Sequence, residues 1–341
     1  MIYRGKKRAP RVLLGSFALA ACLISPEATA QSRASPGCAQ APTSSLVVDV
    51  KNKGAKGDGE TDDTAAIQVA IEEIAGTGGT VLVPDGTYMV NAEGEDRLRL
   101  KSDMTLKLST GATLKAIPNS SKKYSVLSIS GVSNVTVVGG TLEGDRKQHM
   151  GKSGEWGMGI RIDRGASHIT MRGVTSLGMW GDGFYVDDAK DVKFCSVTAD
   201  NNRPQGLSII DADGVLVTDS VFKNTSGTRP SAGIDLEPDK ATQEITNVQI
   251  RGSKFLDNAG SGIQMSGKKG PYFEDRANGQ CVQEQSPHPR RECSGSAFLG
   301  DLRQSASHRS IRVIRRSQCL RGPGRGRRAS KQLSGWSGRP F

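Results

Sequence analysis

Cysteine and histidine are scarce in this sequence, and neither is arranged as in a conventional site. The chain has six cysteines and four histidines among its 341 residues. The cysteines form no CxxC pair and no compact cluster, so their spacing predicts neither a zinc site nor a disulfide framework. The histidines are scattered along the chain, and two of them lie beyond residue 285. A histidine-centred site is therefore not expected.

Long hydrophobic runs are also missing. The one apolar stretch, residues 12–24, follows a basic segment without acids and is too short to anchor the chain across a bilayer. Ala28-Thr29-Ala30 then offers a small-x-small cleavage site, which predicts a signal peptide over residues 1–30 and an exported product, periplasmic or secreted. A competing interpretation is Leu19-Ala20-Ala21-Cys22, which resembles a bacterial lipobox and would place a lipid anchor on Cys22. Residues 31–46 are a linker in either case.

A short phrase recurs in the middle of the chain, a glycine followed by alternating apolar and polar residues. Its copies begin at Gly159, Gly183, Gly206, Gly233 and Gly262, so the spacings are 24, 23, 27 and 29 residues. Such spacings are typical of one solenoid coil each. The pattern predicts an all-β fold, a right-handed parallel β-helix, over residues 47–270.

A second alternating ladder follows the first within each coil, as in Ile169-Thr170-Met171. Alternation with β-branched residues, interrupted by Gly, Asn and Asp, indicates short strands with one face in a stacked core. Asp200, Asn224 and Asn258 recur at one offset, so we expect them to stack as turn residues from coil to coil.

The start of the solenoid requires a cap, because its first strands have no partner on one side. Asp62-Asp63-Thr64 opens a run over residues 65–75 in which Ile67, Ile71 and Ile74 share one face. This run is predicted to be a capping helix of about three turns. A strand over residues 80–83 and a turn at Pro84-Asp85-Gly86 follow it.

The passages GAKGDGETDDTAAIQVAI and GGTVLVPDGTYMV, together with LRLKSDMTLKLSTGATLKA, resemble the start of the pectate-lyase-superfamily β-helices. The likeness is greatest to the glycoside hydrolase family 28 polygalacturonases and rhamnogalacturonases, and it covers roughly residues 47–267. It implies the β-helix fold and a polysaccharide substrate. These motifs build the cap and first coils, so they specify the fold more than the activity.

Residues 271–341 abandon the repeat and carry thirteen Arg and one Lys against five acids, which is nine of the chain's eleven net positive charges. The segment lacks an apolar period, aromatic interleaving and helix caps. It is therefore predicted to be a disordered tail rather than a nucleic-acid-binding element. Loss of the repeat in mid-solenoid also suggests a shifted reading frame.

Chemistry is expected on the outward columns of the solenoid. If Ile160, Phe184 and their equivalents point inward, one outward column contains Arg161, Tyr185, Ser208, Asp235 and Gln264. The next column contains Asp163, Asp187, Ile210, Glu237 and Ser266. Same-face residues of a strand lie ~6.5–7 Å apart. Asp235 and Glu237 are therefore predicted to be the acid and base of an inverting glycosidase.

Further polar and aromatic side chains surround this pair. Asp182 and Asp187 are expected to assist it, because stacked carboxylates shift one another's pKa. The side chains predicted to contact the sugar are Trp156, Arg161, Trp180, Tyr185, Arg203 and Gln205. Arg203 would bind an acidic sugar, and Glu155 would border the groove together with Trp156.

The catalytic motifs of polygalacturonases are mostly replaced here. Those enzymes carry Asn-Thr-Asp, Gly-Asp-Asp, Gly-His-Gly and Arg-Ile-Lys in successive coils. The corresponding segments in this chain are Trp180-Gly181-Asp182, Asn201-Asn202-Arg203 leading into Gln205-Gly206, Ala232-Gly233-Ile234 and Ile263-Gln264-Met265. Asp182 alone matches, so the resemblance implies a site in the same place built from other residues.

A second likeness keeps lysis or epimerisation open. Asn201-Asn202-Arg203-Pro204-Gln205-Gly206 resembles the NN-x-R-x-G phrase of β-helical alginate epimerases, although their Asp-Pro-His-Glu motif is absent. Such enzymes need a base and a group that neutralises the uronate carboxylate. Arg203 or Tyr185 would be the base, and Asp163 with Asp187 would hold Ca²⁺.

The sequence thus predicts an exported protein that hydrolyses an acidic or plant-type polysaccharide with paired carboxylates and no cofactor. A polyuronate lyase or epimerase, with Ca²⁺, is the second hypothesis. A non-catalytic β-helix that binds glycan or supports the cell envelope is the third. No nucleic-acid partner and no membrane span are expected, and the oligomeric state stays open.

Overall fold

The computed structural model describes residue 38, residues 44–94 and residues 97–265. The chain divides into two units, Met1–Ala34 and Ser35–Phe341, and every described residue belongs to the second. The predicted signal peptide, the alternative anchor at Cys22 and the predicted tail lie outside the described residues. No helix in the described ranges has the length and apolar character needed to cross a membrane.

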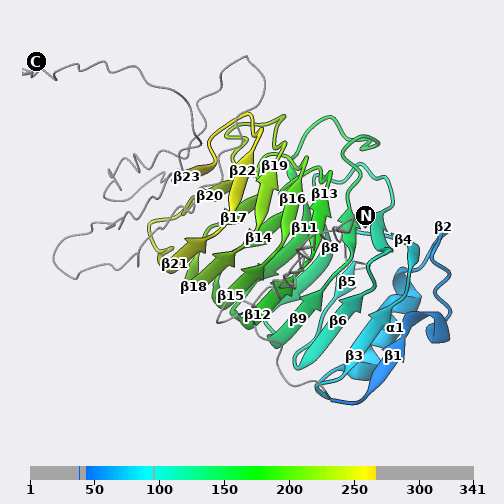
Figure 1. Cartoon of the computed structure of the whole chain (residues 1–341). Helices are drawn as coiled ribbons and strands as arrows, with labels where there is room; N and C mark the ends of the chain where they lie inside the picture. The colour runs from blue at the N-terminus through cyan, green and yellow to red at the C-terminus, as the bar shows by residue number, and fades with distance from the viewer. Residues whose placement is uncertain (1–37, 39–43, 95–96, 266–341) are drawn as a thin grey trace, which may run out of the picture. The chain divides into compact units, whose positions relative to one another are not determined.

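Three parallel sheets of eight, eight and seven strands form the described structure (Figure 1). The first sheet contains β1 (Val47–Asp49), β3 (Thr80–Val83), β6 (Met104–Leu108), β9 (Ser133–Val138), β12 (Ala166–Arg172), β15 (Ala189–Cys195), β18 (Ala212–Thr218) and β21 (Ile245–Arg251). The second contains β2 (Asp58–Asp62), β4 (Gly86–Val90), β7 (Ala112–Ala116), β10 (Thr141–Glu143), β13 (Thr175–Leu177), β16 (Thr198–Asp200), β19 (Val221–Lys223) and β22 (Lys254–Leu256). The third contains β5 (Leu98–Arg99), β8 (Lys123–Ser130), β11 (Trp156–Asp163), β14 (Phe184–Val186), β17 (Leu207–Ile209), β20 (Ile234–Leu236) and β23 (Ile263–Met265).

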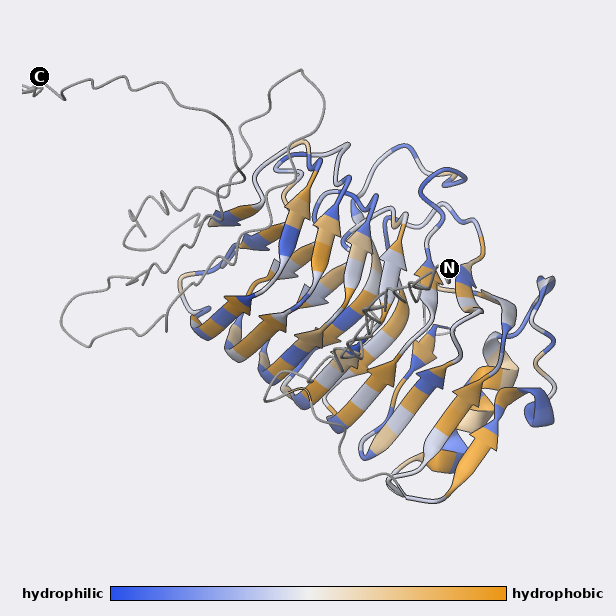
Figure 2. Ribbon diagram, viewed as in Figure 1, coloured by the Kyte–Doolittle hydropathy of each residue, from blue (hydrophilic) through white to orange (hydrophobic). Residues whose placement is uncertain are grey.

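Each turn of the chain adds one strand to each sheet, so the prediction of a right-handed parallel β-helix is confirmed. Alternate side chains point into the stack, which produces the banding of hydrophobic and hydrophilic residues along the strands in Figure 2. The inward positions of the third sheet, Ile160, Phe184, Leu207 and Ile234, are fully buried. The apolar core thus continues from coil to coil.

The amino-terminal cap consists of a short 3-10 helix (Val50–Lys53) and the helix α1 (Thr64–Ile74). Ile67, Ile71 and Ile74 are fully buried, so the predicted apolar face of the helix is confirmed. The Asp62 carboxylate accepts the N–H of Thr64 at 3.0 Å, which satisfies a free donor of the first turn.

The repeat glycines allow close approach between neighbouring coils. A Cβ added to Gly206 would lie 2.5 Å from the carbonyl oxygen of Gly233, and one added to Gly183 would lie 2.6 Å from that of Gly206. The same collision, at 2.5 to 2.6 Å, would occur at Gly159 and Gly233. The glycines that open the first four copies are therefore required by packing between backbones, whereas a Cβ on Gly262 would meet only the side chain of Phe255, at 3.0 Å.

The predicted stack of turn residues is wrong in its register. The strand pairing aligns Asp200 with Lys223, and Lys223 with Leu256, although the Asn224 amide still donates to Asp200 Oδ1 at 2.7 Å. Asn202 and Asn258 are the buried members: Asn258 Oδ1 accepts the N–H of Thr225 at 3.1 Å, and Asn202 Oδ1 accepts that of Met179 at 2.9 Å. The sequence offered two adjacent polar positions per turn, and it did not reveal which one points inward.

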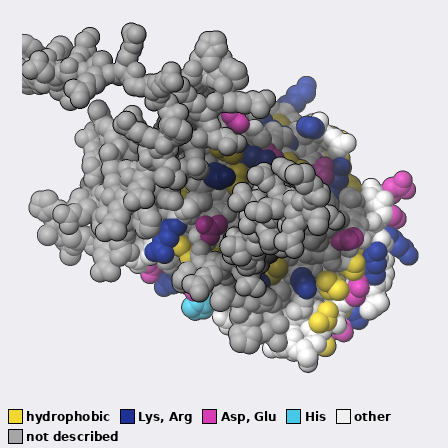
Figure 3. Space-filling view, viewed as in Figure 1, with side chains coloured by type: hydrophobic (Ala, Val, Ile, Leu, Met, Phe, Trp, Pro, Cys, Tyr) yellow, Lys and Arg dark blue, Asp and Glu magenta, His cyan; other side chains and the backbone are white. Residues whose placement is uncertain are grey.

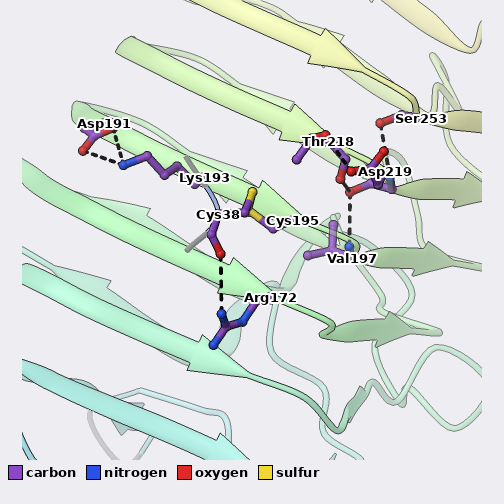
Figure 4. The surroundings of a disulfide bond; sticks show 10 residues. Cys38, Arg172, Asp191, Lys193, Cys195, Val197, Thr218, Asp219 and Ser253 are labelled. Atoms are coloured by element: carbon purple, nitrogen blue, oxygen red, sulfur yellow. Dashed lines mark hydrogen bonds and ion pairs between the residues drawn. A yellow bond between two sulfur atoms is a disulfide. The ribbon is translucent and has the colours of Figure 1, made fainter. Parts of the chain in front are cut away.

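One disulfide corrects the expectation drawn from the cysteine spacing. Cys38 is bonded to Cys195 at the end of β15, across a sequence separation of 157 residues (Figure 4). The backbone carbonyl of Cys38 also accepts a hydrogen bond from Arg172. The pairing was not expected because the solenoid brings together two cysteines with no local spacing pattern.

Candidate functional site

The strand register aligns the predicted outward column of the third sheet. Arg161 pairs with Tyr185, Tyr185 with Ser208, Ser208 with Asp235, and Asp235 with Gln264. The register predicted for this column is therefore confirmed, but two of its members, Ser208 and Asp235, are fully buried rather than exposed. In the described part of the surface shown in Figure 3, acidic and basic side chains are interspersed, and neither sign gathers into one patch.

Asp182 is a buried acid at the turn that leads into β14. Its carboxyl is 4% exposed, and its Oδ1 accepts the backbone N–H of Gln205 at 3.1 Å. Burial raises the pKa of Asp182 well above its usual range, and the negative charge of Glu237 raises that pKa further. A carboxyl whose pKa is raised by burial and by a neighbouring charge is suited to act as a general acid.

Glu237, which follows β20, supplies a second carboxyl to the same place. Its Oε1 lies 3.4 Å from Nε2 of Gln205. Gln205 therefore contacts both carboxyl groups, Asp182 through its backbone N–H and Glu237 through its side-chain amide. Glu237 and Asp182 thus lie around the same glutamine, although they belong to different coils.

The other predicted carboxylates are placed differently. Asp235 is fully buried on β20, next to Ser208 of β17. Asp187 accepts a hydrogen bond from Gln243 at 3.1 Å, and burial together with the negative charge of Asp211 raises its pKa. In the described contacts Asp187 bonds to Gln243 rather than to the carboxyl pair around Gln205.

Tyr185 lies near the acids Asp187 and Asp182. Burial, followed by the negative charge of Asp187, raises its pKa far above the usual range of a phenol. Tyr185 therefore carries its proton at physiological pH. It can donate a hydrogen bond to a substrate, but it is poorly suited to abstract a proton.

Arg203 is held by protein groups, so the structure gives it a role that the sequence did not reveal. Its Nε donates to Thr228 Oγ1 at 2.6 Å and its Nη2 to the carbonyl of Gly154 at 3.0 Å. Its guanidinium lies 3.7 Å from the centre of the Trp180 ring. The Trp180 and Arg203 side chains thus contact each other instead of projecting as separate sugar contacts.

Trp156 is available at the border of this region. It is 48% exposed at the start of β11, and it pairs in register with Lys123 of β8. Burial and the nearby positive charge of Arg161 lower the pKa of Lys123. Exposed aromatic rings stack on sugar rings, and cations bind their carboxylates, so this pair is suited to contact an acidic sugar.

The predicted calcium ligands do not fit a calcium site. Asp163 Oδ2 forms an ion pair with Arg161 at 2.7 Å, and Asp187 bonds to Gln243. Calcium takes six to eight oxygen ligands. Among the described residues no group of three or more His, Cys, Asp or Glu side chains is arranged to hold a metal ion.

Sequence analysis missed a group of buried residues beside this site. Asp145 and His149 form a pair in which Nδ1 lies 2.9 Å from Oδ2, and both side chains are fully buried. The ring of His149 stacks on Trp180 with centroids 4.2 Å apart. Only the spacing of four residues between Asp145 and His149 could have suggested the pair, and a pattern that short is common by chance.

Comparisons with known proteins agree with this architecture. Residues 47–281 match the family described as rhamnogalacturonase A/epimerase, pectate lyase-like. The chain is 28% identical over 254 residues to the uncharacterized protein YclG of Bacillus subtilis, and this alignment covers 64% of this chain and 43% of YclG. It is 35% identical over 187 residues to mannuronan C5-epimerase AlgE4 of Azotobacter vinelandii, 51% of this chain and 33% of that protein.

Two further likenesses extend the comparison. The chain is 47% identical over 73 residues to an exo-poly-alpha-D-galacturonosidase of Dickeya chrysanthemi, 21% of this chain and 11% of that enzyme. The solved A-module of Azotobacter vinelandii AlgE4 aligns with a TM-score of 0.49 and 24% identity, over 64% of this chain and 74% of that one. The chain spans less than half the length of the curated relatives described here. The family match covers most of the chain, and the chain belongs to the rhamnogalacturonase A/epimerase family of pectate lyase-like β-helix proteins.

Proposed function

We propose that this protein is an exported carbohydrate-active enzyme that hydrolyses glycosidic bonds in an acidic polysaccharide. The observation that carries the proposal is the buried carboxyl of Asp182, whose pKa is raised. A second carboxyl, that of Glu237, contacts the same glutamine, Gln205. Glycosidases use such a pair, with one member protonated and the other charged. In this proposal Asp182 is the proton donor and Glu237 is the base.

Other side chains of the third sheet accompany this pair in the proposal. Asp235 is fully buried on β20 next to Ser208 of β17, and Tyr185 offers a proton-bearing hydroxyl. Trp156 and Lys123 would bind a neighbouring sugar by stacking and by charge. An acidic substrate is supported by the ammonium group of Lys123 and by the names of two relatives, a mannuronan C5-epimerase and an exo-poly-alpha-D-galacturonosidase.

Export is supported by the disulfide between Cys38 and Cys195, because disulfides form and persist in oxidising compartments. The periplasm and the extracellular space both satisfy this condition. An anchored lipoprotein would satisfy it as well.

A polyuronate epimerase or lyase is the second candidate, favoured by the identity of 35% to a mannuronan C5-epimerase. Two observations weigh against it. Tyr185 holds its proton too tightly to act as a base, and Arg203 is engaged with Thr228 and Gly154. A calcium ion at Asp163 and Asp187 is not supported by their pairing.

The test is incubation of the purified protein with a panel of polyuronates and neutral glycans. Reducing ends without ultraviolet absorbance would support hydrolysis, whereas absorbance of an unsaturated uronate would support a lyase. A changed uronate composition, read by NMR without chain cleavage, would support an epimerase. Binding without any of these changes would favour the non-catalytic β-helix.

Substitutions then test the assigned residues. Asp182→Asn and Glu237→Gln should each lower kcat by about 10²–10⁴-fold, the range of general acid–base catalysis. Glu60→Gln is the matched control, because Glu60 is exposed on β2 in the first coil. Full activity in both Asp182→Asn and Glu237→Gln would contradict the assignment.

A further inference from the structure

The loop 144–155 joins β10 to β11 and reaches over the turns of later coils. The guanidinium of Arg146 donates to the carbonyls of Asn201 at 2.8 Å, Asn202 at 3.0 Å and Ser226 at 2.9 Å. At the other end of the loop, the carbonyl of Gly154 accepts from Arg203 at 3.0 Å. The loop is thus fastened to the two coils that follow Asp182.

Four flat groups stack on one another, and one of them, His149, belongs to this loop. The rings of Tyr124 and His149 have centroids 6.0 Å apart and planes 22° apart. His149 and Trp180 are closer, with centroids 4.2 Å apart and planes 18° apart. The guanidinium of Arg203 covers the ring of Trp180 at 3.7 Å. Trp180 therefore has a histidine contact and an arginine contact, and its ring has little freedom to rotate.

Asp145 fixes the histidine within this stack. Its carboxylate accepts the hydroxyl of Tyr124 and the N–H of Asn119, the latter at 3.1 Å, and it pairs with Nδ1 of His149 at 2.9 Å. Burial and the charge of Asp145 raise the pKa of Tyr124, so the phenol remains a donor. Three donors thus converge on a buried carboxylate, which is the arrangement that orients a buried polar network.

The stack is connected directly to the proposed acid. We name Trp180-Gly181-Asp182 the acid turn. The N–H of Gly181 donates to the carbonyl of Gly157 at 2.7 Å, and the N–H of Arg203 donates to the carbonyl of Gly181 at 2.9 Å. A Cβ on Gly181 would lie 2.5 Å from the nitrogen of Gly157. Displacement of the Trp180 ring would therefore be transmitted to Asp182, two residues away.

We propose that Asp145 and His149 are positioning residues that hold the acid turn through the indole of Trp180. They contact no reacting atom in this scheme. Their effect is to keep Asp182 buried and aligned with Gln205. The relevance to catalysis rests on the proposed function, whereas the positioning itself is a physical property of the folded protein.

The test measures the carboxyl of Asp182 directly, by ¹³C NMR titration of protein labelled at aspartate. Asp182→Asn identifies the resonance by its loss. In the wild type the midpoint should lie well above that of an ordinary aspartate. In His149→Ala the midpoint should fall toward the ordinary value, because a loosened acid turn admits water. His149→Phe should restore the midpoint, because a flat ring can still support Trp180.

His168→Ala is the matched control. His168 also pairs with an aspartate, Asp191 at 3.0 Å, but it is exposed on the first sheet. Its substitution should leave the Asp182 midpoint unchanged. An unchanged midpoint in folded His149→Ala would overturn the proposal. If His149→Ala does not fold, His149→Leu fills the space without stacking or pairing, and an unchanged midpoint in that variant would overturn it equally.

Kinetics provide the second readout on a substrate that the wild type turns over. His149→Ala should lower kcat by up to about 100-fold with KM unchanged, the scale of a small misplacement of a catalytic group, and His149→Phe should recover most of it. A rise in KM with kcat unchanged would contradict a positioning role. Absence of turnover in the wild type would reject the proposed function, and the Asp182 titration would still decide this inference.

Discussion

At the scale of single residues, Asp182 shows how the fold changes the chemistry of an ordinary side chain. The carboxyl is buried, and the charge of Glu237 acts on it, so its pKa is raised well above the usual range. Ionisation of Asp182 therefore costs the folded state free energy that it does not cost the unfolded chain. Burial of the proposed general acid therefore lowers the free energy of unfolding at higher pH, where Asp182 ionises.

This cost can be measured by comparing the wild type with Asp182→Asn. A raised folded-state pKa contributes stability below the ordinary aspartate pKa and loses it as pH rises through the folded value. The free energy of unfolding of Asp182→Asn should therefore increase relative to that of the wild type as pH rises through this window. Urea unfolding across acid to neutral pH measures the difference, with Glu60→Gln as the control. A difference that does not change with pH would contradict the assigned burial of Asp182.

The sequence could place Asp182 in the site but could not rank it above Asp235. Asp182 was recognised as the matching position of the family motif, and the repeat aligned it with Gln205. Its raised pKa depends on burial and on the charge of Glu237, a residue of a later coil, and neither carries a periodic signal. The Asp145–His149 pair was missed for the same reason, because its partner Trp180 belongs to a later coil.

At the scale of the coil, the repeat predicted the strands but not the packing that requires its glycines. The alternation gave the register of the column from Arg161 to Gln264 correctly, but not the burial of Ser208 and Asp235 within it. The glycine that opens each copy marked the period, but the alternation did not say why a glycine is needed there. In the first four copies a Cβ on this glycine would collide with the carbonyl of the next coil, so a larger residue would separate neighbouring strands locally.

Gly206→Ala tests this packing requirement. The added Cβ would meet the carbonyl of Gly233 at 2.5 Å and the ring of Phe222 at 2.9 Å. We expect the free energy of unfolding to fall by about 3 kcal/mol or more, the upper part of the range for overpacking. Gly178→Ala is the comparison, because Gly178 has a positive φ but open space, and its cost should be about 1–2 kcal/mol. Equal losses would show that close approach does not explain the repeat.

At the scale of the whole described stack, the disulfide ties a residue that precedes the first strand to β15. Its sequence separation of 157 residues makes it a constraint mainly on the unfolded chain. Local sequence patterns report contacts within a coil or between neighbours. A bond that spans several coils leaves no such pattern, which is why the cysteine spacing was misleading.

Replacement of both cysteines tests the size of this constraint. Cys38→Ser with Cys195→Ser should lower the free energy of unfolding by about 2–5 kcal/mol, the usual effect of losing a native disulfide. Chemical unfolding with and without reductant measures it. Reductant should lower the stability of the wild type to that of the double variant and leave the double variant unchanged. A wild type that is insensitive to reductant would contradict the contribution.

The same bond determines how the stack would respond to mechanical tension. A pull on the chain ahead of Cys38 passes through the disulfide into β15, so the residues between the two cysteines form a closed loop that carries no tension. Asp182 and the loop 144–155 lie inside this shielded loop, whereas Glu237 lies beyond Cys195. Stretching would therefore strain the coils that carry one carboxyl of the proposed site while leaving the other at rest.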